Sequence, residues 1–197
     1  MKAILMSDRA YWCMLMMNKK KKLEVRKGTA LYKAIQKLID ENGYADIYVY
    51  CTKDKSGDNN GNVIGRCYAP QISLKVIGGR GKVIFKFRCY KVEEIETSHD
   101  RFDEEIWYST GSMEEEDILE HSCLNSDELD NYLYGEKGTA IHISDLEIFD
   151  KPKELSEFKS YKKNIVNTKI NGMVFETELD NSIIKAPQSY MFIEAGE

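Results

Sequence analysis

The chain has 197 residues, of which 42% are hydrophobic and 31% are charged, and its formal net charge is −5. This composition is typical of a soluble globular protein, and the length suits one domain with insertions. No stretch approaches the roughly 18 consecutive apolar residues that a membrane span needs, and the acidic balance argues against a protein whose whole surface binds polyanions. Any nucleic acid would have to bind at a local basic patch.

The first 17 residues are apolar but contain Asp8 and Arg9, and no small-residue cleavage site follows them, so we do not expect a signal peptide. Five cysteines are scattered without CxxC spacing: Cys13, Cys51, Cys67, Cys89 and Cys123. This pattern favours free thiols in a reducing cytoplasm over disulfides or a zinc site. We therefore expect a cytoplasmic protein with no metal, no cofactor and no membrane partner.

The chain is predicted to begin with a buried strand over Lys2 to Met6, followed by a helix from about Arg9 to Lys19. Ser7 and Asp8 can cap that helix, because their oxygens accept hydrogen bonds from the free amides of a first helical turn. Trp12 falls on the apolar side of the helix. An aromatic residue on the apolar side of a helix most often packs in the core, but Trp12 could instead line a cleft and stack on a flat ligand.

The stretch NKKKKLEVRK follows, with four lysines at the predicted end of the helix and then an alternating run. In a strand, alternate side chains point to opposite faces. Leu23 and Val25 would therefore face the core, and Lys22, Glu24 and Arg26 would share the other face. That polar set is either a solvated sheet edge or the floor of a site for an anionic ligand.

The middle of the chain shows three periodic segments. Residues 30–42 have the spacing of an amphipathic helix that ends at an Asn-Gly pair, and residues 46–52 and 82–92 alternate as strands. The stretch 53–66 is rich in glycine, asparagine and aspartate but has neither phosphate-loop nor EF-hand spacing. We expect it to be a mobile hairpin loop.

The second half begins with an acidic stretch, residues 93–120, which is expected to be an irregular surface arm. Residues 125–133 predict a capped helix, and residues 138–152 predict a strand. On that strand His142 is expected to be a buried, hydrogen-bonded core residue and not a catalytic base. Asn171-Gly172 lies between two alternating runs, which is a strong signal for a β-hairpin.

Three separated stretches of the chain resemble the ASCH domains of the PUA-like superfamily. Lys21, Glu24 and Arg26 match the Lys-x-x-Glu-x-Arg of the family's signature. Residues 138–158 are similar to its late strand and to the Lys-Glu-Leu-Ser-Glu-Phe tail that follows. Residues 186–194 are similar to the strand that closes the family's barrel.

This resemblance covers about half of the chain. It implies an α+β fold, with a small, mostly antiparallel β-barrel of about five or six strands and flanking helices. Residues 1–197 would form a single domain of this type, with insertions near 29–43, 93–120 and 159–185. Many members of the family come from phages and low-GC bacteria.

The resemblance also implies a cleft between the first helix and the second strand that binds RNA, another nucleic acid, or a nucleotide or nucleoside. Its basic groups would hold phosphate, and an aromatic ring would stack on a base. The candidate ligand-binding residues are Trp12, Lys21, Lys22, Glu24, Arg26 and Tyr190.

Two alternatives stay open. Some ASCH relatives hydrolyse RNA or an acyl group on a modified nucleoside, and Lys21 with Glu24 could act as acid and base if burial shifted their pKa values. The threonine nucleophile of those relatives has no counterpart here, because Glu24 stands three residues after Lys21. The other alternative is a phage accessory protein that acts by protein–protein contact, through the acidic stretch and the Asn171-Gly172 hairpin.

Overall fold

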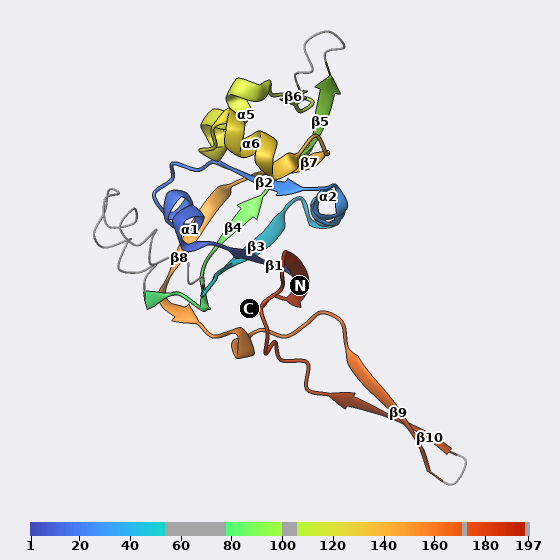
Figure 1. The fold of residues 1–197 in the computed structure, drawn as a ribbon. Coiled ribbons are helices and arrows are strands. Elements are labelled where there is room, and N and C mark those ends of the chain that lie inside the picture. The colour runs from blue at the N-terminus through green and yellow to red at the C-terminus, as the bar shows by residue number, and fades with distance from the viewer. Residues whose placement is uncertain (54–77, 100–105, 171–172, 196–197) are drawn as a thin grey trace.

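The centre of the molecule is a five-stranded sheet in the order β11-β1-β3-β4-β8 (Figure 1). The computed structural model describes residues 1–53, 78–99, 106–170 and 173–195. β1 and β3 run parallel, and the other neighbours are antiparallel. The strands are β1 (Lys2–Asp8), β3 (Ala45–Cys51), β4 (Lys82–Cys89), β8 (Ser144–Lys153) and β11 (Tyr190–Glu194).

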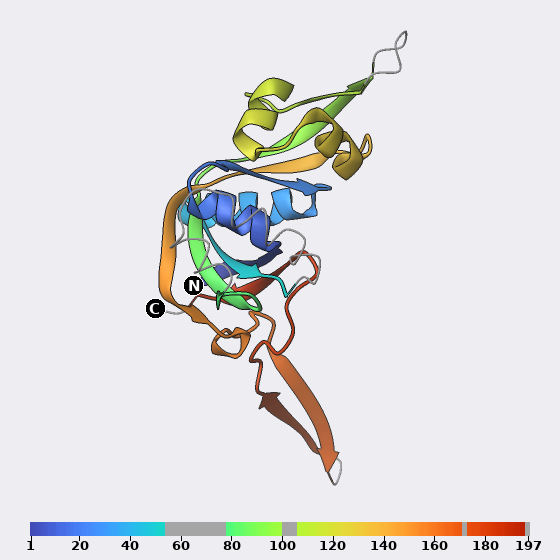
Figure 2. The same ribbon diagram turned by 60° about the vertical axis from the view of Figure 1, so that its left-hand side comes forward.

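A second, antiparallel sheet has the order β2-β7-β5-β6. Its strands are β2 (Leu23–Lys27), β5 (Val92–His99), β6 (Ile106–Ser109) and β7 (Gly138–His142). The chain passes directly between the sheets from β4 to β5 and again from β7 to β8, and together they curl into a half-barrel (Figure 2). The predicted α+β fold with a small, mostly antiparallel β-structure is therefore confirmed.

Four α-helices and one 3-10 turn accompany the strands in the described ranges. They are α1 (Ala10–Met17), α2 (Ala30–Asn42), α5 (Glu115–Ser122), α6 (Ser126–Leu133) and η1 (Leu155–Glu157). Six of the eight residues of α1 are buried, so it is a core helix. α2 buries one face and ends at Gly43, whose φ of 82° favours glycine. None of these helices is long and apolar enough to span a membrane.

β1 is buried on both faces, which explains why it has no polar side until its end. On one face, Ile4 and Met6 belong to the main core cluster with α1 and α2. On the other face, Ala3 and Leu5 pack in a second cluster that includes Tyr48. This double burial holds the last residues of β1 in a fixed position beside the candidate site.

The expected irregular arm at residues 93–120 is wrong. Most of β5, all of β6 and most of α5 lie in this stretch. Ile95, Tyr108 and Ile118 are buried in the core cluster of the second sheet, and the acidic residues between them mask this apolar pattern in the sequence.

The loop expected at residues 53–66 falls outside the described residues after position 53.

The predicted β-hairpin around Asn171-Gly172 is confirmed by its strands. β9 (Asn164–Ile170) and β10 (Met173–Leu179) form an antiparallel pair in which Ile170 lies opposite Met173. Residues 171 and 172 themselves lie outside the described chain. The ribbon projects away from the two sheets in both views (Figures 1 and 2).

Candidate ligand-binding site

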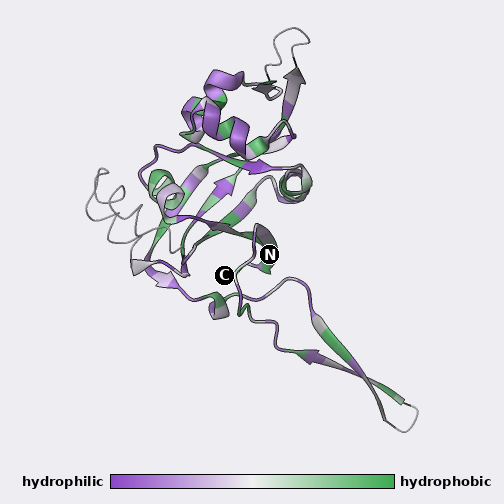
Figure 3. Ribbon diagram, in the orientation of Figure 1, coloured by the Kyte–Doolittle hydropathy of each residue, from purple (hydrophilic) through white to green (hydrophobic). Residues whose placement is uncertain are grey.

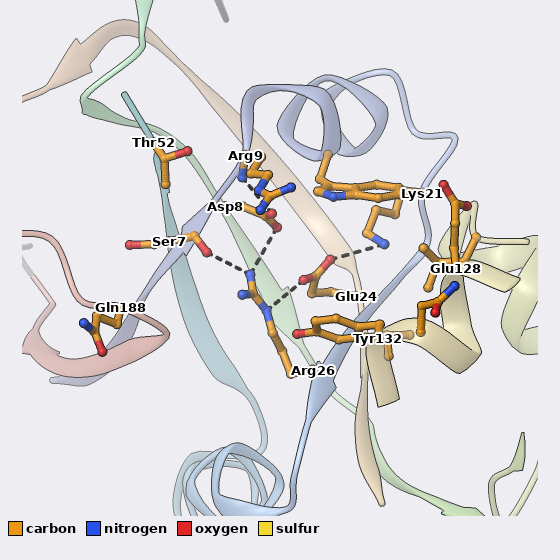
Figure 4. A pocket seen from close by; sticks show the side chains of 14 residues that line it. Ser7, Asp8, Arg9, Lys21, Glu24, Arg26, Thr52, Glu128, Tyr132 and Gln188 are labelled. Carbon is orange, nitrogen blue, oxygen red and sulfur yellow. Dashed lines mark hydrogen bonds and ion pairs between the residues drawn. The ribbon is translucent and has the colours of Figure 1, made fainter. Parts of the chain in front are cut away.

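A cavity of about 560 Å³ lies between α1, β2, α6 and the end of β1 (Figure 4). Small-molecule sites in proteins commonly have volumes of about 300 to 1,000 Å³. The lining side chains are Ser7, Asp8, Arg9, Trp12, Lys21, Glu24, Val25, Arg26, Thr52, Leu124, Glu128, Asn131, Tyr132 and Gln188.

β2 supplies the floor of this cavity. Leu23 and Val25 are buried in the core cluster of the second sheet, as the alternation predicts. Glu24 is also buried, with 4% of its surface exposed, and its carboxylate lies between Lys21 and Arg26. The polar face of β2 is therefore an internal surface and not a solvated edge.

Four charges of alternating sign form a chain along the floor, of which three are buried and the fourth, Arg26, has 13% of its side chain exposed. Lys21 Nζ lies 3.3 Å from Glu24 Oε2, and Glu24 Oε1 lies 2.8 Å from Arg26 Nε. Arg26 Nη2 in turn lies 3.2 Å from Asp8 Oδ2. Each charge thus has a partner of opposite sign, which offsets the cost of removing it from water. The Arg26 Nε–H does not point along its short contact, so that contact is an ion pair without an aligned hydrogen bond.

The same two basic residues connect separate parts of the fold. Lys21 Nζ donates a hydrogen bond of 2.8 Å to the carbonyl oxygen of Ser122, the last residue of α5. Arg26 Nη2 donates one of 2.9 Å to the carbonyl oxygen of Ser7 on β1. Lys21 Nζ also lies 4.7 Å from the centre of the Trp12 ring, a cation–π geometry. Trp12 packs against the core and also lines the cavity.

Asp8 is the buried acid at the far end of the chain of charges. Burial raises its pKa to about 7, and the neighbouring Glu24 carboxylate adds to this shift, while Arg26 and Lys21 oppose it. For Arg26, burial lowers the pKa, but the two carboxylates outweigh burial and leave the pKa raised. Near neutral pH the cavity wall therefore carries a fixed guanidinium beside a carboxyl group that can hold a proton.

The capping role expected for Ser7 and Asp8 is wrong. The residue before α1 is Arg9, and its side chain makes no capping hydrogen bond. Asp8 Oδ1 accepts a hydrogen bond of 2.9 Å from the Arg9 amide, which lies before the helix, and Asp8 Oδ2 faces Arg26. The sequence signal for the place of Asp8 in the cavity was its position, because Asp8 ends β1 shortly after the apolar run Ala3 to Met6.

Four of the six candidate ligand-binding residues come together in the cavity: Trp12, Lys21, Glu24 and Arg26. Lys22 is exposed and Tyr190 packs beside Phe192 against the main core, and neither belongs to the lining. The wall contributed by α6, including Tyr132, was not anticipated. The helix itself was predicted, but its position against β2 depends on contacts between distant residues.

His142 lies outside the cavity lining, and its Nε2 lies 2.8 Å from Glu93 Oε2, with 28% of the side chain exposed. The histidine is hydrogen-bonded as expected, although it is only partly buried. Among the residues that the structure describes, no three His, Cys, Asp or Glu side chains are arranged to hold a metal ion.

Comparison with protein-family profiles and with curated protein sequences found no match. Among solved structures, the ASCH protein from Zymomonas mobilis has a TM-score of 0.43 at 13% identity, over 78% of this chain and 73% of that chain. A tyrosine-to-phenylalanine variant of it has a TM-score of 0.44 at 14% identity, over 78% and 76%. The N-terminal domain of Staphylothermus marinus McrB has a TM-score of 0.38 at 9% identity, over 79% and 77%. These similarities are distant and carry no argument about family or function.

Proposed function

We propose that this protein binds RNA or another nucleic acid, or a free nucleotide, by holding one nucleotide in the cavity between α1 and β2. The observation that supports this most is the buried chain of alternating charges beside an indole ring. Arg26 and Lys21 offer donors to phosphate or base oxygens, and Trp12 offers a stacking surface. The match of these β2 residues to the ASCH signature points the same way.

The two carboxylates favour a nucleotide over a simple anion. Glu24 and Asp8 would repel a bare anion at the floor of the cavity, but they can accept hydrogen bonds from the amino groups of a base. The phosphate would then lie toward Arg9, which is exposed at the rim. One nucleotide thus uses both kinds of polar group that the cavity offers.

Replacement of Trp12 by leucine tests the stacking role. Loss of one stacked base costs about 1 to 3 kcal/mol, so Trp12→Leu should weaken binding of labelled single-stranded RNA by about tenfold to a hundredfold in fluorescence anisotropy. Trp107→Leu is the matched control, because Trp107 is 49% exposed and lies outside the cavity lining. Circular dichroism and thermal melting should show that both variants are folded.

A charge variant gives the second reading of the same experiment. Arg26→Gln should weaken binding and also reduce its salt dependence, whereas Arg88→Gln, on the exposed face of β4, should do neither. Wild-type affinity in both folded cavity variants, for RNA and for the four nucleoside monophosphates, would rule out this function.

A hydrolase acting on RNA or on a modified nucleoside is a second candidate. Its support is the pKa of about 7 at Asp8, which is suited to proton transfer near neutral pH, in the same cavity as Lys21 and Glu24. Incubation with RNA and with acylated nucleosides, followed by chromatography, tests it. Product that forms with the wild type but not with folded Glu24→Gln would indicate an enzyme, and no product would leave binding alone.

A further inference from the structure

The β9–β10 ribbon is an unfinished sheet. Within the described ranges its two strands pair only with each other, and both views show it extending away from the body (Figures 1 and 2). An isolated two-stranded ribbon is at best marginally stable in water, and three or more strands are usually needed. The ribbon therefore lacks a partner for at least one of its edges.

Its surface also carries more apolar side chains than a solvated hairpin needs. Hydrophobic residues occur along both strands (Figure 3). The register places Val166 opposite Thr177, and alternation puts Met173 and Leu179 on the same face. The exposed apolar side chains are Ile165, Val166, Met173, Val174 and Leu179, each exposed by 42% to 66%. Exposed apolar side chains on both faces of a projecting ribbon indicate an interaction surface.

The two edges of the ribbon differ in charge. β9 has one charged residue, Lys169, next to its last position, and the five residues before it are uncharged, three of them β-branched. β10 carries Glu176 and Glu178, both exposed. Charged side chains on an edge strand oppose pairing with a further strand. The β9 edge is therefore open to strand addition, and the β10 edge is protected against it.

We propose that the β9 edge binds a second copy of this chain. The two β9 strands pair antiparallel about a twofold axis, and the ribbons form a four-stranded sheet in the order β10-β9-β9-β10. Antiparallel self-pairing of β9 about Asn167 sets no two charged residues against each other, because Lys169 then lies opposite Ile165. Self-pairing of β10 would instead set Glu176 and Glu178 beside their own copies. This inference is independent of what the cavity binds.

A twofold arrangement is favoured over the other ways of covering the ribbon. Pairing of β9 with the β10 edge of a neighbour would leave the same two edges available at each end, so the chains would grow into filaments and not close. A nucleic acid would meet two glutamates, Glu176 and Glu178, and a single lysine, Lys169, along the two strands, and the excess of carboxylates disfavours phosphate. Pairing of β9 with β9 closes the assembly at two chains.

The test uses the full-length chain in sedimentation velocity over a range of concentrations. The wild type should form dimers. The double variant Ile165→Lys/Asn167→Lys should raise the dimer dissociation constant by about tenfold or more, because any antiparallel self-pairing of β9 would then bring lysines together. The control Val174→Lys/Thr177→Lys adds the same charge to β10 and should leave the dimer intact.

Hydrogen exchange on the wild type gives a reading that does not depend on how a variant folds. Amides of β9 should exchange more slowly as the protein concentration rises, while amides of β10 should not respond. A wild type that stays monomeric at every concentration would overturn the proposal. Equal weakening by the two double variants, or growth beyond dimers, would overturn it as well.

Discussion

Two carboxylates in this molecule are buried to nearly the same degree but hold their protons very differently. Asp8 is 7% exposed and its pKa is raised to about 7, whereas Glu93 is 9% exposed and its pKa is lowered to about 2. Asp8 lies at the wall of the cavity, and Glu93 lies on β5 in the second sheet. The exposed fraction alone therefore does not set the proton affinity of either group, and Asp8 also lies deeper in the protein than Glu93.

The difference lies in what surrounds each carboxylate. Burial raises the pKa of Glu93 too. Hydrogen bonds from four residues lower it by more than burial raises it: Ser112, Lys91, His142 and Thr110. The contacts to Lys91 Nζ, His142 Nε2 and Thr110 Oγ1 are 3.0, 2.8 and 3.0 Å long. These contacts join β5 to β7 and to the turn after β6, so the Glu93 carboxylate has a structural role in the second sheet.

Asp8 has fewer stabilising partners and an acidic neighbour. It accepts one backbone hydrogen bond from Arg9 and faces Arg26, while Glu24 raises its pKa. Asp8 also lines the cavity, where a bound group could reach it. The comparison suggests that a satisfied buried acid is a structural element, and that an incompletely satisfied one beside a cavity is a candidate for contact with a ligand.

The largest effect that would test this comparison is expected at Glu93. A carboxylate with a lowered pKa stabilises the fold above its unfolded-state pKa, near 4.5, and loses that contribution as the pH falls toward 2. Glu93→Gln should therefore lower the free energy of unfolding by about 2 kcal/mol at pH 7, with little difference from the wild type near pH 2.

Urea unfolding at several pH values measures this difference. Glu94→Gln is the matched control on the same strand, because Glu94 is more exposed and pairs mainly with Lys137, and it should cost well under about 1 kcal/mol. If Glu93→Gln were neutral at pH 7, the carboxylate would not be acting as a structural element.

A smaller effect of opposite sign is expected at Asp8. A carboxyl group whose folded pKa is raised makes the wild type less stable as the pH rises from about 4 to about 7. Asp8→Asn should remove this slope. At pH 8 it should be more stable than the wild type by about 1 kcal/mol, since the lost ion pair with Arg26 offsets part of the gain.

Thermal unfolding between pH 4 and pH 8 checks the slope, and a carboxyl-carbon NMR titration of the wild type reads the pKa of Asp8 directly. A variant several kcal/mol less stable at pH 8 would contradict the comparison. It would mean that Asp8 is held as an ion by Arg26 and is as structural as Glu93.

Local periodicity predicted much of the fold. α2 spans residues 30–42 as expected, and the hairpin strands flank the Asn-Gly pair. The grouping of Glu24 with Arg26 on one face of β2 also followed from alternation. These features depend on neighbours in sequence, where spacing alone carries the information.

The parts that sequence reasoning missed depend on contacts between distant residues. The cavity needs Arg26 to reach Asp8, 18 positions earlier, and Lys21 to reach Ser122, 101 positions later. The ordered strands and helix in residues 93–120 were obscured because acidic residues alternate with the buried ones. The acidic composition of residues 93–120 indicated a solvated surface, but the spacing of a few apolar side chains in that segment determined its structure.

The direct passages from β4 to β5 and from β7 to β8 restrict how the two sheets can move. Only Ile143 separates β7 from β8, and two residues separate β4 from β5. Connections this short limit relative movement of the two sheets, so a ligand bound as proposed would meet the charged floor already in place. Binding of such a ligand would then require little ordering of the protein, and selectivity would depend on how well the ligand matches the shape and charge of the preformed cavity.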